Sequence, residues 1–189
     1  MDLVVREFKM FLNIVTPCSR PENLHIINQS INIPKDNYRW IVVFDLDELP
    51  NKELIPTNCE TYLYRENGSV VGHAQRNYAL DIIDDGYVYF NDDDTTIHPN
   101  LWKTIKNFNS DFISFIQLNK NGQMRLIGNE VRVGGIDSHN FIVSRNVVGS
   151  SRFFINRYDA DGYFAQECYL KSISKTHFNI PLSIYNNLR

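Results

Sequence analysis

The sequence predicts a single α/β domain in which helices flank a mostly parallel central sheet, with antiparallel strands added in the second half. Two observations predict this fold class. Apolar segments rich in β-forming residues alternate with segments of helical periodicity through the first half, as in parallel β-α-β units. The 189 residues, of which 43% are hydrophobic, suffice for one core, and no linker, repeat or low-complexity tract divides them.

The expected strands of the first half end at polar or turn-forming residues. Arg39–Phe44 is apolar after its first residue, so we expect an inner parallel strand covered by helices on both faces. Thr61–Tyr64 is expected at an edge. In chain order, the strands of this half are Phe11–Thr16, Arg39–Phe44, Thr61–Tyr64 and Tyr87–Phe90. The helices, identified by apolar residues at helical spacing, are Glu22–Ser30, His73–Ile83 and Leu101–Phe108.

The second half has fewer clear elements. Phe112–Leu118 indicates a buried strand, and Asn121-Gly122 after it is typical of a hairpin turn. Asn140–Ser144 indicates a later strand, and Asp161–Ile173 is the last clear helix.

Composition excludes several classes of protein. The formal net charge of -3 and the isoelectric point near 5.9 argue against a nucleic-acid-binding protein, which normally presents a basic face. No apolar run is long enough for a membrane span, and Met1–Glu7 does not resemble a signal peptide. The 3 cysteines form neither a disulfide framework nor a metal-binding pattern. We therefore expect a cytoplasmic protein, and the abundant Asn, Ile and Lys fit the AT-rich genome of a bacterium or of a virus in an infected host cell.

Three consecutive aspartates, Asp92, Asp93 and Asp94, directly follow Asn91 at the end of the strand Tyr87–Phe90. Carboxylates at the carboxyl end of a strand lie where open α/β sheets bind ligands. Because the three repel one another, a site that keeps them ionised usually supplies a cation, and oxygen ligands suit Mg²⁺ or Mn²⁺. The alternative for such a run is a solvated acidic turn.

Five segments, taken in order, resemble nucleotide-sugar glycosyltransferases of the GT-A fold. The closest likeness is to the inverting β-1,3-glucuronyltransferase family, and a looser one is to family 2 enzymes. It runs continuously over residues 12 to 105 and is patchy afterwards. The matching segments are Thr16-Pro17 with Arg20-Pro21, Trp40–Asp45, Gln75–Asn77, Tyr89–Asp94 and Ala160–Phe164.

The resemblance implies a metal-dependent reaction that moves a sugar from a UDP-sugar to a hydroxyl group of a glycan or glycoconjugate, with Mn²⁺ or Mg²⁺ as cofactor. A nucleotide-binding half would cover residues 10–110 and an acceptor half residues 111–189. The closest family implies inversion of configuration, and the sequence leaves retention open.

The same resemblance implies roles for residues on the donor side. Asp92 would contact the ribose, Asp94 would hold the metal, and Asp45 would accept a hydrogen bond from the N3–H of uracil. Arg20 would balance the charge of the diphosphate. The full set of expected donor contacts is Thr16, Pro17, Arg20, Asp45, Arg76, Asp92 and Asp93.

Asp161 aligns with the catalytic base of the family. It precedes a helical pattern, so we expect the helix N-terminus to favour its anionic form. Gly162 follows it and would leave room for an acceptor. The alternative for Asp161 is a helix cap. Glu167 is a second candidate base, for which the alternative is a solvated helix face.

Two further residues have open interpretations. Asp137 either binds acceptor hydroxyls or caps a turn. His177 either completes the metal shell, as a histidine near that point does in enzymes of this fold, or is structural. The sequence departs from the glucuronyltransferases at Ala74, where that family has an acidic residue.

Two rival functions remain. The segment Val43–Leu49 resembles the loop of haloacid-dehalogenase-like phosphatases, with Asp45 as nucleophile and Asp47 as acid. That family expects Thr or Val where Leu49 stands. The second rival is a catalytically inactive nucleotide-sugar-binding module, which would keep Asp45 but need no metal.

Overall fold

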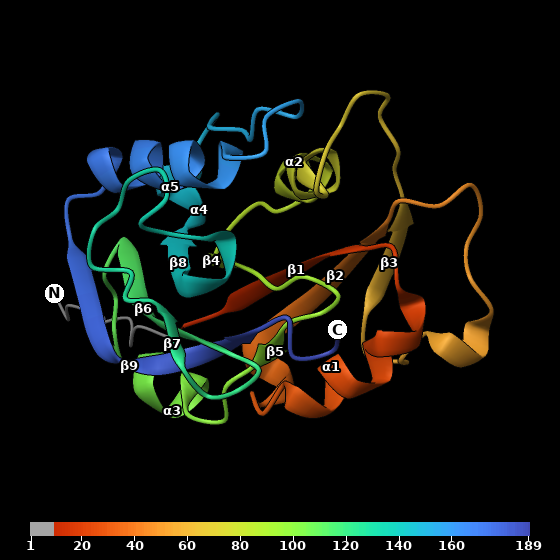
Figure 1. Ribbon diagram of the computed structural model, residues 1–189, viewed down its shortest axis with the longest axis horizontal. Coiled ribbons are helices and arrows are strands. Elements are labelled where there is room, and N and C mark those ends of the chain that lie inside the picture. Colours follow the sequence, from red (N-terminus) through yellow and green to blue (C-terminus); the bar gives the residue numbers. More distant parts are fainter. Residues whose placement is uncertain (1–9) are drawn as a thin grey trace, which may run out of the picture.

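A computed structural model describes residues 10–189 as a nine-stranded sheet with helices on both faces (Figure 1). The segment Met1–Glu7, interpreted above as unlike a signal peptide, lies outside the described residues. No helix of the described part is both long enough and apolar enough to cross a membrane.

The sheet combines a parallel half with a mixed half. In spatial order its strands are β3 (Glu60–Leu63), β2 (Tyr38–Phe44), β1 (Leu12–Cys18), β4 (Tyr87–Phe90), β8 (Phe141–Ser144), β6 (Phe112–Asn119), β9 (Lys175–Tyr185) and β5 (Thr96–Ile97), and β7 (Met124–Leu126) pairs with β6. The first four are mutually parallel, whereas β8 runs antiparallel to both of its neighbours. The expected mostly parallel sheet with antiparallel additions in the second half is confirmed.

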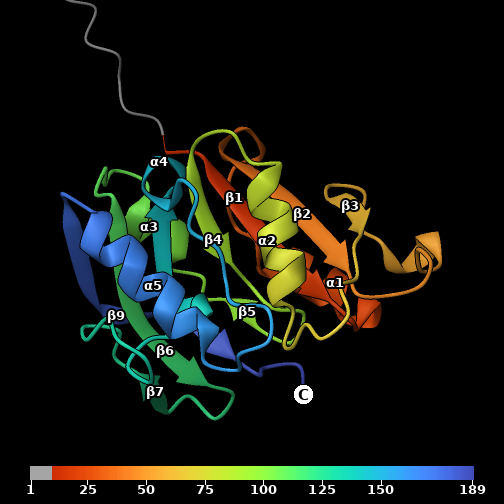
Figure 2. The ribbon, with the colours of Figure 1, turned by 90° about the horizontal axis from the view of Figure 1, so that it is seen from above.

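Helices cover the two faces of the sheet as separate layers. In Figure 1, one layer holds α2 (His73–Asp81), α4 (Arg145–Val148) and α5 (Ala160–Lys171), and the other holds α1 (Leu24–Ser30) and α3 (Leu101–Ile105). Figure 2 shows α2 and α5 side by side on their face. Single-turn 3₁₀ helices are found at Pro21–Asn23, Lys35–Asn37, Lys52–Leu54 and Ser138–Asn140.

The side chains of β2 show why that strand is apolar from Trp40 to Phe44. Trp40 and Phe44 pack into the core beneath α1 and α3, whereas Ile41 and Val43 pack into the core beneath α2 and α5. All four are buried. A strand covered on both faces needs apolar residues at every position, so the expectation of an inner parallel strand is confirmed.

The hairpin turn expected at Asn121-Gly122 is confirmed, since it joins β6 to β7, but the sequence did not reveal the bounds of β7, nor β9, β5 or α4. The 11-residue β9 carries Pro181 in its interior, and its pairing with β6 shifts register near Phe115 and Ile116. A proline and a bulge are features that argue against a strand when only local sequence is considered. The other three elements have 2 to 4 residues and are too short to show a period.

Candidate active site

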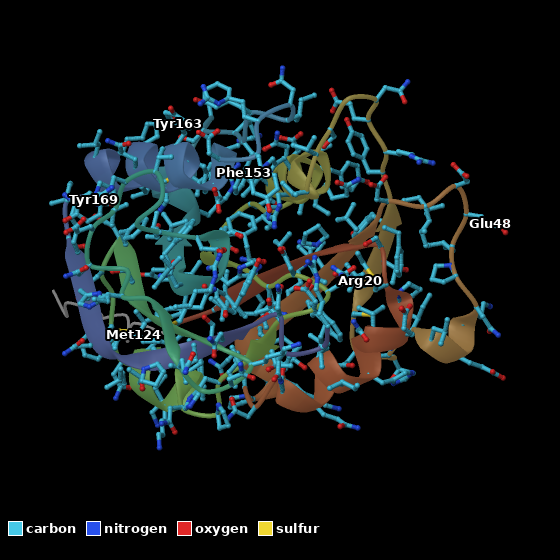
Figure 3. The ribbon with its side chains drawn as sticks, viewed as in Figure 1. Arg20, Glu48, Met124, Phe153, Tyr163 and Tyr169 are labelled. Atoms are coloured by element: carbon cyan, nitrogen blue, oxygen red, sulfur yellow. The ribbon has the colours of Figure 1, made fainter. Side chains whose placement is uncertain are left out.

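A cavity of about 550 Å³ opens at the carboxyl ends of the parallel strands. Its floor is formed by the residues that follow β1, β2 and β4, and one wall by the start of α2. The opposite wall comes from β7, the loop before β8, the start of α5 and the segment after β9. In Figure 3, Arg20 lies near the centre of the view at the end of β1, and Phe153 lies between α5 and α2.

The structure brings nine of the residues expected in the site to this cavity. They are Pro17, Arg20, Asp45, Arg76, Asp92, Asp93, Asp94, Asp137 and Asp161. The elements that carry them are far apart in the sequence, so their convergence is a result of the fold.

Thr16 and His177 are placed elsewhere. Thr16 is fully buried in β1, where its Oγ1 accepts a hydrogen bond from Trp40 Nε1 (3.0 Å), so it supports the strand instead of lining the nucleotide pocket. His177 is exposed on β9, with Nδ1 3.1 Å from Ser114 Oγ. His177 pairs with Ser114 and Tyr185 with Asn119, so the two lie roughly 17 Å apart at about 3.3 Å per residue of β6, and Tyr185 reaches the cavity whereas His177 does not.

Asp93 ties the loop after β4 to the end of β1. Its Oδ2 accepts hydrogen bonds from the backbone N–H groups of Ser19 (2.7 Å) and Arg20 (2.8 Å). Its Oδ1 accepts from the Arg20 guanidinium, with Nε at 2.9 Å. A carboxylate so fully paired holds the floor of the cavity rigid.

Asp92 belongs to a buried chain of alternating charges. Arg76 donates to Asp92 Oδ1, and His139 Nε2 lies 2.8 Å from Asp92 Oδ2. On its other side, His139 Nδ1 lies 2.5 Å from Asp137 Oδ1, and Arg125 Nη1 lies 2.6 Å from Asp137 Oδ2. This charge chain (Arg76, Asp92, His139, Asp137 and Arg125) joins the wall at the start of α2 to the opposite wall.

The charges in this chain shift one another's pKa values. Burial opposes the charge on His139, but Asp92 and Asp137 outweigh it and raise its pKa to about 10. Burial also opposes ionisation of Asp92, but Arg76 and His139 lower its pKa to about 2. Near neutral pH His139 is therefore an imidazolium between two carboxylates. Asp137 also caps the 3₁₀ helix Ser138–Asn140 through its hydrogen bond from His139 N, which is the capping alternative considered from the sequence.

Asp94 is the aspartate best suited to a metal. Its Oδ2 lies 3.0 Å from Arg20 Nη2 and 2.5 Å from Arg189 Nε, while Oδ1 accepts a long hydrogen bond from Thr95 Oγ1 (3.3 Å). Within residues 10–189, no three His, Cys, Asp or Glu side chains form a metal-binding cluster. A Mg²⁺ or Mn²⁺ ion held by one carboxylate and substrate phosphates needs no such cluster. Asp94 fits that mode if the ion takes the place of Arg189 beside its carboxylate.

The turn before α2 places Arg76 in the cavity wall. Val71 and Gly72 have φ values of 45° and 77°, and a β-branched residue in that region is strained. A Cβ on Gly72 would lie 2.6 Å from Pro17 Cβ, so glycine allows α2 to begin directly against β1. The Val71 carbonyl accepts a hydrogen bond from Arg76 Nη1 (2.6 Å), which fixes the guanidinium toward Asp92.

Asp161 lines the wall opposite the aspartates. It lies in the first turn of α5, where Asp159 is the N-cap residue, so Asp161 is not the cap. Burial, together with the charge of Asp137, raises its pKa to about 6, contrary to the expectation that the helix N-terminus would dominate and favour the anion. A carboxylate with this pKa is suited to accept a proton near neutral pH.

Gly162 and Glu167, on the same helix as Asp161, have structural roles. A Cβ on Gly162 would lie 2.7 Å from Val133 Cα, so this glycine allows close packing of helix and loop and does not leave room for an acceptor. Glu167 is absent from the cavity wall; its Oε1 accepts hydrogen bonds from Ser151 Oγ (2.7 Å) and Lys171 Nζ (2.6 Å).

Asp45 lies at the far end of the floor, after β2. Its side chain is 45% exposed and lies 3.5 Å from Arg65 Nε. Asp47, which a phosphatase would use as its acid, is 91% exposed, pairs with Arg65 Nη1 (2.7 Å) and does not line the cavity. Both carboxyl groups pair with Arg65 but only Asp45 lines the cavity, whereas the phosphatase alternative requires both in one site.

Sequence reasoning missed His139, Arg125, Tyr185 and Arg189. Arg125 lies over the Tyr185 ring, 3.7 Å from its centroid. Only His139 had a sequence signal, since it lies two residues after Asp137. Arg125 reaches the cavity on β7, and Tyr185 and Arg189 reach it at the end of β9 and beyond, elements whose bounds the sequence did not reveal.

Comparison with known proteins identifies the fold. Neither the protein-family models nor the curated proteins contain a match to this chain. Among solved structures, S. aureus TarS residues 1–349 aligns with a TM-score of 0.74 and 17% sequence identity over 93% of this chain and 60% of TarS. The complex of that protein with UDP-GlcNAc aligns with a TM-score of 0.72, 16% identity, and coverage of 93% and 58%.

A second neighbour comes from an archaeon. The mannosyltransferase PcManGT from Pyrobaculum calidifontis, in complex with GDP-Man and Mn²⁺, aligns with a TM-score of 0.69 and 11% identity over 95% of this chain and 57% of that one. This chain has the fold of nucleotide-sugar glycosyltransferases. It spans at most 60% of the length of these neighbours. The finer likeness to β-1,3-glucuronyltransferases stays a prediction.

Proposed function

We propose that this protein is a glycosyltransferase that moves a sugar from a UDP-sugar to a hydroxyl group of a glycan or glycoconjugate. The observation that carries the proposal is one cavity with two unlike walls. Three aspartates with Arg20 and Arg76 line the donor side, and Asp161, with its raised pKa, lies opposite. The three free cysteines fit a reducing compartment, so we place the reaction in the cytoplasm.

On the donor side, each residue has a distinct task. Asp45 accepts the N3–H of uracil, and Asp92, fixed by Arg76 and His139, accepts the ribose hydroxyls. Arg20 and Arg189 supply positive charge beside Asp94, where the diphosphate binds. These assignments follow the resemblance and the placement of the side chains in the cavity.

On the opposite side, Asp161 removes the proton from the acceptor hydroxyl as its oxygen attacks the anomeric carbon. The bond between that carbon and the diphosphate oxygen breaks, and the electron pair leaves with UDP. A base on the face opposite the leaving group implies inversion of configuration. Asp94 would hold Mn²⁺ or Mg²⁺, which supplies Lewis-acid stabilisation of the diphosphate when bound.

Hydrolysis of UDP-sugars without an acceptor tests the proposal. A transferase is expected to show slow hydrolysis of one UDP-sugar that stops on chelation of the divalent cation. A phosphatase would instead prefer simple phosphate esters, and an inactive binding module would hydrolyse neither. Either of the last two results would refute the proposal.

Binding of UDP is expected to require a divalent cation, because Asp94 would otherwise face the diphosphate as a like charge. Calorimetric titration with Mn²⁺ should give a measurable affinity that EDTA removes. In Asp94→Asn, Mn²⁺ should no longer strengthen UDP binding. The control is Asp36→Asn, an exposed aspartate outside the cavity, which should bind as wild type. Equal affinity with Mn²⁺ and with EDTA in the wild type would remove the metal from the mechanism.

Selectivity for uracil is expected to depend on Asp45. The Asp45→Ala variant loses an acceptor for N3–H, and a hydrogen bond to a charged group contributes about 1.5–3 kcal/mol. The preference for UDP over CDP should therefore fall by roughly 10- to 150-fold. Asp47→Ala is the matched control, since Asp47 lies on the same loop outside the cavity. An unchanged preference in Asp45→Ala would assign base recognition to other residues.

A further inference from the structure

Exposed aromatic side chains are found close in sequence to Asp161. Among the described residues, four aromatic side chains are strongly exposed, and three of them, Phe154 (53%), Tyr158 (79%) and Tyr163 (37%), lie within ten positions of one another. Tyr158 lines the cavity together with Asp161, three residues further along the chain. Single exposed aromatics are ordinary on a protein surface, but Tyr158 is the one of the three that lines the cavity, where an aromatic ring is typical of a ligand contact.

The loop that carries this cluster is firmly anchored. Asn77 holds the backbone of Phe153 on both sides, with Nδ2 2.9 Å from the carbonyl oxygen and Oδ1 2.8 Å from the N–H group. The Phe153 ring stacks on Phe164, 4.2 Å between centroids. Val70 N donates to Ile155 O at 2.9 Å. Figure 2 shows this loop running beside α2 before α5 begins.

Polar contacts fix the far end of the loop as well. The Arg157 guanidinium lies 4.3 Å from the centroid of the Tyr163 ring and is bound by both oxygens of Asp159, each at 3.0 Å. Tyr163 is found on α5, on the outer side of that helix in Figure 3. The loop therefore presents Tyr158 from a fixed support while leaving most of that side chain in solvent.

The wall that carries Tyr158 offers both apolar and charged groups. Leu126, Val133, Ile136 and the Tyr185 ring line it beside charged side chains that include Asp161. A pyranose ring has hydroxyl groups at its edge and a face of C–H groups. The hydroxyl groups suit a carboxylate acceptor, and the C–H face suits an aromatic ring. An acyclic polyol has no such flat face.

We propose that Tyr158 forms the acceptor subsite, on which the C–H face of a pyranoside stacks so that one of its hydroxyl groups points at Asp161. The inference rests on the proposed function and names the acceptor class, a pyranose-containing glycan. Asp159, which also lines the cavity, offers a carboxylate to hydroxyl groups at the edge of the pyranoside.

Saturation-transfer NMR in the presence of UDP and Mn²⁺ tests the subsite without requiring turnover. The probes are the methyl pyranosides of glucose, galactose, mannose and N-acetylglucosamine, with ribitol and glycerol as acyclic comparisons. In wild type, at least one pyranoside should receive saturation at its ring C–H protons. In Tyr158→Ala its dissociation constant should rise roughly tenfold. Tyr158→Phe should bind as wild type, and Leu170→Ala, an exposed apolar residue on α5 outside the cavity, is the matched control.

Three results would overturn the subsite: no saturation of any pyranoside, equal saturation of ribitol, or unchanged affinity in Tyr158→Ala. Acceptor-free hydrolysis of the UDP-sugar, measured on the same variants, separates this inference from the proposed function. Hydrolysis that persists in Tyr158→Ala, while pyranoside binding is lost, supports both. Hydrolysis together with unchanged pyranoside affinity refutes only the subsite, and absence of hydrolysis in wild type refutes the glycosyltransferase itself.

Discussion

Asp161→Asn is expected to lower turnover by about 10²–10⁴-fold while leaving the affinity for UDP nearly unchanged. The asparagine keeps the size of the side chain but cannot take a proton from the acceptor. Because Asp161 lies on the wall opposite Asp92–Asp94, donor contacts should persist. Turnover with a saturating UDP-sugar and calorimetric titration with UDP measure the two quantities separately.

Glu167→Gln is the matched control for this variant. Glu167 lies on the same helix, outside the cavity, and pairs with Lys171, so the variant should retain wild-type turnover. An inactive Glu167→Gln combined with an active Asp161→Asn would mean that the base is misassigned. If both variants stay active and the product keeps the anomeric configuration of the donor, the enzyme is retaining and needs no base at this position.

The raised pKa of Asp161 should make both turnover and folding stability depend on pH. A base with a pKa of about 6 must be deprotonated to act, so turnover should rise with pH through that value. A carboxyl group whose pKa is higher in the folded state than its usual 3.8 lowers stability as pH rises through that window, and the cost remains above about pH 6. Asp161→Asn should therefore be at least as stable as wild type at pH 7, which urea denaturation can measure.

Local patterns predicted the parallel half of the sheet and the aspartates that follow β4, for physical reasons that β2 and Asp92–Asp94 illustrate. A strand covered on both faces must be apolar at every position, and ligand groups of an open α/β sheet must follow its strands directly. Both requirements concern residues that are adjacent in the chain, so they can be recognised in the sequence. The placement of Asp161 in the same cavity is consistent with the resemblance over Ala160–Phe164.

The opposite wall could not be predicted in the same way. Tyr185 and Arg189 reach the cavity through β9, whose pairing with β6 joins residues distant in sequence and includes register shifts. Arg125 lies on β7, a three-residue strand whose pairing with β6 is also shifted. His177 illustrates the resulting error, because a histidine near the end of the chain looks suitable for a metal until the course of β9 is known. The position of His139 depends equally on distant partners, since Asp92 comes from the loop after β4.

His139→Gln is expected to lower the free energy of unfolding by about 3–5 kcal/mol, the usual cost of removing one partner from a buried ion pair. The imidazolium lies 2.8 Å from the half-buried Asp92 and 2.5 Å from the buried Asp137, so its loss leaves these two carboxylates facing each other. Urea denaturation at pH 6 measures the loss. His177→Gln, an exposed histidine on β9, is the control and should unfold as wild type.

The pH dependence of this loss distinguishes the charge on His139 from its packing. The pKa of His139 is raised from its usual 6.5 to about 10 in the folded protein. Its stabilising charge interaction is therefore fully present below pH 6.5 and is lost as pH rises through about 10. The difference between wild type and His139→Gln should accordingly be largest near pH 6 and shrink steadily toward pH 10. A difference that stays constant across this range would mean that His139 contributes shape and not charge, and that Asp92 is held in place by Arg76 alone.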